Sequence, residues 1–167
     1  MSSDQVPKLR SRSTISAELP VGWEFTESYT LLAPGREANI IFSSEPVHSD
    51  MDSETYARDQ GVLLRSEFPG FRQIGQLERF YITGLPEAGW LREFSWVPPK
   101  QEEVRQMQLY AARSGRGFTV TATSPELTSA VYSPELLSVL QSLIIDVEAA
   151  DRFAADQPAT DQSEILK

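Results

Sequence analysis

The residues best suited to chemistry lie in one polar stretch, "EPVHSDMDSE", which contains the only histidine of the chain, His48. A single histidine does not by itself supply a Ser-His-Asp triad or a cluster of metal ligands. Asp50, Asp52 and Glu54 follow at the alternate spacing of a calcium loop, but the glycine at the sixth position and the distal bidentate glutamate are missing. We therefore expect these acids to cap the helix that follows, at the positive end of its dipole.

The other candidate motifs are equally weak. The stretch "RSGRG", residues 113–117, lacks the Lys-Ser/Thr pair of a phosphate-binding loop, and it predicts a hairpin turn instead. The chain has no cysteine, which excludes disulfides, thiolate metal sites and cysteine nucleophiles. No spacing selects an acid/base pair among the scattered carboxylates, which include Glu18, Glu27, Glu37, Glu78, Glu87 and Glu93. The sequence thus predicts a protein that is not an enzyme and has no metal site and no cofactor.

Composition limits the partners of the protein. The 167 residues are 40% hydrophobic, which is enough for one domain with a core. The formal net charge of -9 makes the protein a poor match for nucleic acid or anionic membranes. No apolar run approaches the ~20 residues that span a bilayer. No apolar region follows the basic residues near the N-terminus, as it would in a secretory signal. We expect a cytoplasmic protein that is not itself embedded in a membrane.

Most of the chain has the alternating pattern of β-strands. Strand-like runs punctuated by glycine or proline occupy residues 13–19, 28–34, 37–45, 71–82, 89–97 and two segments within 101–125. Two segments have helical period instead. The first runs from about Ser53 to Glu67, and the second has Ser133 as N-cap, Pro134 at its first helical position and Val147 near its end.

These elements predict a single α+β domain. We expect an antiparallel meander sheet with two helices packed on one face, formed by residues 13–147. Residues 1–12 are expected to be a flexible leader. Residues 148–167 are expected to form an acidic tail, which is either solvated or used to bind a partner.

The strand "VRQMQLY" is the most informative element for function. Because side chains alternate across a strand, Gln106 and Gln108 share one face, and Met107 and Leu109 share the other. Two helices on one face of the sheet would leave the opposite face open, with Ile41 and other apolar residues beside the two amides. A surface of this composition is typical of a protein-binding face. A solvated sheet face is the simpler alternative for the glutamines.

An ordered set of motifs resembles a known family. "LPVGWEF", "APGREANIIFSSE", "ETYARDQ", "FPGF", "WLREFSW", "VRQMQLY" and "GFTVTATSP" follow one another as in the DcrB-like superfamily, and look most like the Eag chaperones of type VI secretion effectors. The resemblance covers residues 15–145. It implies a PsbP-like fold, a homodimer, and an open sheet face that shields the N-terminal transmembrane helices of a toxin effector before export. The exported lipoproteins of the superfamily need a signal and an acylatable cysteine, so the cytoplasmic chaperones are the better match.

The resemblance also implies a set of cargo-binding residues. By motif position these are Asn39, Ile41, Ser43, Gln60, Gln106 and Gln108, with Tyr29 and Leu31 as aliphatic or aromatic wall positions. The alternative for Gln60 is a cap on the sheet edge, and for Ile41 it is burial under a dimer partner. The leader and the tail are longer than the family pattern and have no assigned role. The alternative function is a PsbP-like binding module for a soluble protein partner or an assembly subunit.

Overall fold

The computed structural model describes residues 27–82 and 87–145. The strand expected at residues 13–19, the leader at 1–12 and the tail at 148–167 lie outside the described residues. Those described form an antiparallel sheet and two α-helices, so the expected α+β class is confirmed. The strands are β1 (Glu27–Leu32), β2 (Asn39–Pro46), β3 (Arg72–Phe80), β4 (Gly89–Trp96), β5 (Val104–Arg113) and β6 (Arg116–Pro125). The helices are α1 (Ser53–Glu67) and α2 (Ser129–Gln141).

The six described strands are ordered β1-β2-β6-β5-β4-β3 across the sheet. The strands β3 to β6 follow one another as the expected meander, whereas β1 and β2 form a hairpin whose second strand pairs with β6. The turn between β5 and β6 contains Ser114 and Gly115, both with positive φ, as a tight hairpin turn requires. This order places β6 between β2 and β5, in the middle of the sheet.

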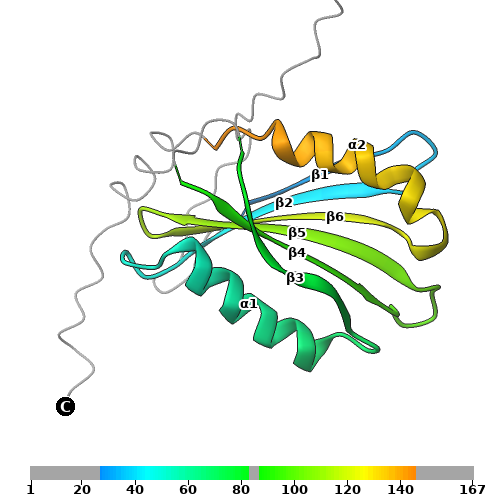
Figure 1. Cartoon of the computed structure of the whole chain (residues 1–167), viewed down its shortest axis with the longest axis horizontal. Coiled ribbons are helices and arrows are strands. Elements are labelled where there is room, and N and C mark those ends of the chain that lie inside the picture. Colours follow the sequence, from blue (N-terminus) through cyan, green and yellow to red (C-terminus); the bar gives the residue numbers. More distant parts are fainter. Residues whose placement is uncertain (1–26, 83–86, 146–167) are drawn as a thin grey trace, which may run out of the picture.

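The two helices lie on opposite faces of the sheet, α1 below it and α2 above it in the view of Figure 1. On β5, Tyr110 and Ala112 pack in a cluster with residues of α1, whereas Met107 and Leu109 pack with Leu140 of α2. Because alternate residues of a strand point to opposite sides, the helices cover different faces. The sequence led us to expect both helices on one face. They divide between the two faces because β5 carries buried apolar side chains on each side, and each side is covered.

The helix α1 has the expected bounds and the expected cap. Asp52 is its N-cap, and its carboxylate accepts a hydrogen bond from the backbone N–H of Thr55 at 2.9 Å. This bond lowers the pKa of Asp52, because it stabilises the ionised carboxylate. At the other end, the ring of Phe68 packs against Trp96 of β4, with centroids 4.3 Å apart.

The helix α2 begins at Ser129, five residues earlier than expected. Ser133 and Pro134 lie inside the helix, not at its start, and the N-cap is Thr128. A short 3-10 turn, Glu126–Thr128, already directs the chain into the helix, and Ser129 Oγ donates to the carbonyl of Glu126 at 2.9 Å. Proline favours the first helical position, which is why the sequence signal pointed to Pro134.

Candidate functional site

A groove runs beside α1 on the face of the sheet that this helix covers in part. Its volume is about 390 Å³. The helix packs mainly against β5 and β4, so β2 and β6 form the floor of the groove on its open side. We call it the α1 groove. It is lined by Ser43, Ser44, Glu45, Tyr56, Gln60, Leu63, Leu64, Glu67, Phe68, Gln108, Thr119 and Thr121.

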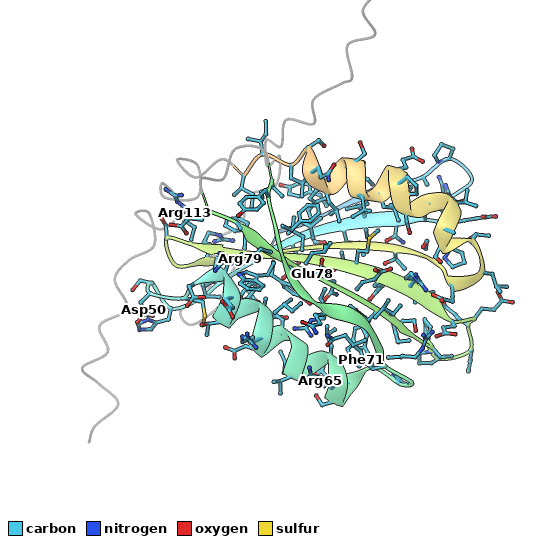
Figure 2. All side chains as sticks on the ribbon, viewed as in Figure 1. Asp50, Arg65, Phe71, Glu78, Arg79 and Arg113 are labelled. Atoms are coloured by element: carbon cyan, nitrogen blue, oxygen red, sulfur yellow. The ribbon has the colours of Figure 1, made fainter. Side chains whose placement is uncertain are left out.

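The helix that forms one wall of the groove runs beneath part of the sheet (Figure 1). Asp50 lies in the loop before α1, while Arg65 and Phe71 lie near the opposite end of the helix (Figure 2). The buried side chain of Arg92, on β4, fixes α1 to the sheet by donating to the carbonyl of Ala57 at 2.8 Å. Gly61 allows this close approach, because a Cβ at that position would lie 2.3 Å from an Arg92 guanidinium nitrogen.

Hydroxyl groups form a column along the middle of the floor. Thr119, Thr121 and Thr123 lie on β6, and in the sheet register they oppose Ser43, Ile41 and Asn39 of β2, in that order. On the other side of the column, Thr121 pairs with Gln108 and Thr123 with Gln106. This face of the sheet, which extends beyond the groove, therefore alternates hydroxyl and amide groups with one aliphatic side chain, Ile41, which is 36% exposed and lies outside the lining. Across the groove, Leu63 of α1 is 49% exposed.

A hydrogen-bond network lies at one end of the groove. Glu45 Oε1 accepts from the Tyr56 hydroxyl at 2.7 Å and from Gln60 Nε2 at 3.0 Å. The Tyr56 hydroxyl also lies 2.9 Å from Thr119 Oγ1. Burial raises the pKa of Tyr56 far above its ordinary value, because the phenolate would be poorly solvated. The tyrosine therefore stays protonated and the Glu45 carboxylate keeps its donor.

The two glutamines of β5 are bonded differently. Gln108 Oε1 accepts a hydrogen bond from the Tyr110 hydroxyl, whose pKa burial raises to about 12. Gln106 Nε2 donates to Thr123 Oγ1 at 3.0 Å. Among the described residues, no donor reaches Gln106 Oε1 or Asn39 Oδ1, and both atoms are buried.

The structure brings most of the predicted site residues to one face. Asn39, Ile41, Ser43, Gln106 and Gln108 all point to the α1 side of the sheet. Gln60 faces them from the helix and bonds to Glu45 of β2. Within this set, the residues that line the groove itself are Ser43, Gln60 and Gln108.

Tyr29 and Leu31 lie on the opposite face from these residues, which corrects their expected place in the wall of the site. They pair with Phe42 and Ile40 of β2, which belong to the core beneath α2. The reason is the period of two along a strand: Thr30, not its neighbours, pairs with Ile41 on the groove side.

Several groove residues were not predicted from the sequence. Glu45, Tyr56 and the β6 threonines lie within the quoted motifs but were not chosen as site residues, and Leu63 lies in none of the motifs. A signal for the threonines does exist, because "TVTATS" and "VRQMQ" are joined by a hairpin turn that brings the threonines and the glutamines to the same face. For Glu45 and Tyr56, only the packing of the helix on the sheet reveals the contact.

The described residues show no arrangement for metal binding. Within 27–82 and 87–145, no three histidine or acidic side chains gather to hold an ion. His48 pairs with Asp50 in the exposed loop before α1. Among the helices that the structure describes, none is long and apolar enough to cross a bilayer.

No family model matches the chain, and no curated protein matches it. Among solved structures, it is similar to PA94 of Pseudomonas aeruginosa, a protein of unknown function, at 20% identity and a TM-score of 0.60, over 76% of this chain and 88% of that one. LpqN of Mycobacterium tuberculosis, involved in cell envelope biogenesis, matches at 18% identity and a TM-score of 0.43, over 66% and 64%. CyanoP, the PsbP of Synechocystis, matches at 10% identity and a TM-score of 0.46, over 75% of this chain and 94% of that one. The likeness to PA94 shows a shared fold.

Proposed function

We propose that the chain is a chaperone of the Eag type, which holds the N-terminal transmembrane helices of a toxin effector of type VI secretion until export. The observation that carries the proposal is the composition of the α1 groove and of the sheet face that continues its floor, where exposed Leu63 and Ile41 lie beside threonine hydroxyls and the amide of Gln108. Membrane helices associate through close packing and side-chain hydrogen bonds. The groove offers a bound helix both kinds of contact.

The dimensions of the sheet fit this cargo. The strand β6 has 10 residues and is about 33 Å long at ~3.3 Å per residue. A helix of ~20 residues, the length that spans a bilayer, is about 30 Å long. Burial of its apolar surface is favourable at about 25 cal/mol per Å², which supplies the driving force for a holder in water.

The rest of the proposal follows the resemblance to the Eag family. The protein acts in the cytoplasm as a homodimer, helps to load the effector on the export apparatus, and performs no catalytic step. Sedimentation at micromolar concentration tests the dimer, and a strict monomer would contradict it. A binding module for a soluble partner is the competing function, and the experiment below separates the two.

The test is co-expression with the protein encoded beside this chain that carries early hydrophobic segments. We expect its N-terminal ~60–100 residues, a span that holds two membrane helices, to stay in the supernatant only with the chaperone present. Deleting the hydrophobic segments should abolish the complex. The proposal fails if the neighbour is equally soluble alone, whereas a complex that survives the deletion indicates a soluble partner.

A further inference from the structure

The α1 groove is acidic among the residues that line it. Two carboxylates, Glu45 and Glu67, lie in its lining, and no lysine or arginine does. The arginines of α1 are not in this lining, and Arg58 is exposed and paired with Glu54 on its own helix, at 2.6 Å. Arg116 lies outside the lining but donates to the hydroxyl of Ser44, a lining residue, at 2.7 Å, so the charges of the described lining itself are all negative.

Glu45 is held in a fixed orientation, and one of its two carboxylate oxygens accepts no hydrogen bond from the described residues. Its Oε1 accepts both hydrogen bonds of the network, from Tyr56 and Gln60, whereas its Oε2 receives none from the described residues. No described basic side chain lies within ion-pair distance of this half-buried carboxylate. A carboxylate that is partly removed from water and already oriented favours a cationic partner, through a charge-assisted hydrogen bond to its free oxygen.

We infer that Glu45 selects, within the proposed function, a helix with a lysine or arginine at one end of its apolar segment. Glu45 lies near the last residue of β2, at one end of the groove, so the basic side chain must lie at one end of the bound segment. Lysine and arginine commonly flank membrane helices, and their apolar stems can follow the groove while the charged group reaches Oε2. Glu45 is thus a specificity-determining residue that fixes the direction of the bound helix.

The experiment uses three probes fused to one soluble carrier protein. Each probe is a 20-residue leucine/alanine segment, with lysine at its first position, at its last position, or at neither, and glutamine in place of the missing lysines. Affinities are measured for the full chain, for Glu45→Gln and for Glu102→Gln. The first substitution keeps an acceptor for Tyr56 and Gln60. The second removes the same charge from an exposed turn between β4 and β5.

We expect the unmodified chain to prefer one of the two lysine probes about fivefold over the neutral probe, as a partly exposed ion pair allows. Glu45→Gln should abolish the preference, so that the three probes bind it equally, while Glu102→Gln should keep the preference. Raising the salt from 50 to 300 mM should weaken it, by screening of the charges.

Two outcomes overturn the inference alone: the three probes bind the unmodified chain equally, or the preference survives in Glu45→Gln. If no probe binds the unmodified chain, the proposed function fails and the inference fails with it. Thermal unfolding of both variants, compared with the unmodified chain, shows whether a lost preference instead reflects a lost fold.

Discussion

At the scale of single residues, the amides of β5 have complementary hydrogen-bonding roles. Gln108 is 8% exposed; its Oε1 accepts from Tyr110, while its Nε2 donates to no acceptor among the described residues. Gln106 is 9% exposed and has the opposite arrangement, with its Nε2 on Thr123 and its Oε1 unpaired among the described residues. The sequence predicts that these glutamines share a face. It does not predict these roles, because they depend on side chains that other elements bring beside them.

The pair of Gln108 and Tyr110 gives a prediction at this scale. We expect Gln108→Ala to lower the free energy of unfolding by about 1–2 kcal/mol, because the buried Tyr110 hydroxyl loses its acceptor. Tyr110→Phe removes the donor, so the double variant should lose less than the sum of the single losses. Urea denaturation of the four proteins completes the cycle. Strictly additive losses would show that the two side chains are not coupled.

At the scale of elements, the sequence predicts what local signals determine. The bounds of α1 follow from the acids before Ser53, the helical period and the Pro69-Gly70 pair after Glu67. The side of the sheet on which a helix lies is not a local property. It depends on which strand face is apolar, and β5 is buried on both faces, so its alternation alone did not assign α1 and α2 to opposite sides.

The N-cap of α1 gives a pH-dependent prediction. In the folded state the hydrogen bond from Thr55 lowers the pKa of Asp52. The carboxylate therefore stabilises the fold in full above the unfolded pKa of about 3.9, and this stabilisation is lost as the pH falls through the folded pKa. Asp52→Ala should therefore lower the free energy of unfolding by about 1 kcal/mol at pH 7.

The difference in free energy of unfolding between Asp52→Ala and the unmodified chain, measured by urea denaturation, should shrink below about pH 4, where the carboxyl group becomes protonated. Asp52→Asn is the matched control: asparagine is also a good N-cap, so this substitution should lower the free energy of unfolding less than Asp52→Ala does. A difference that stays constant from pH 7 down to the folded pKa would contradict this role for the carboxylate.

The contact between Gly61 and Arg92 gives a second prediction for α1. Gly61→Ala would gain about 1 kcal/mol of helix propensity at an open site. Here the new Cβ meets the buried guanidinium that holds Ala57, so we expect a net loss of about 1–3 kcal/mol. In an Arg92→Ala background the clash is absent, and Gly61→Ala should become neutral or stabilising. Thermal or urea unfolding measures the sign, and a loss of equal size in both backgrounds would contradict the proposed contact.

At the scale of the whole molecule, the sequence placed most of the predicted site residues on one face of the sheet without showing the groove. The resemblance placed Asn39, Ile41 and Ser43 with the glutamines, and the strand register brings them together. The groove exists because α1 covers only part of that face, which no single stretch of sequence encodes. Glu45 and Tyr56 belong to the site for the same reason, since a helix and a strand meet there.

The most direct test of a helix-holding groove places a charge on the sheet face that continues its floor. Ile41→Asp puts a carboxylate beneath the bound helix, and Val131→Asp makes the same kind of change on the outer side of α2, where Val131 is 75% exposed. Retention of the effector's N-terminal segment in a co-purification is the measurement. We expect Ile41→Asp to reduce retention at least tenfold, because burying a carboxylate against an apolar helix costs several kcal/mol, and Val131→Asp to retain it fully. Equal retention by the two folded variants would contradict binding in the groove.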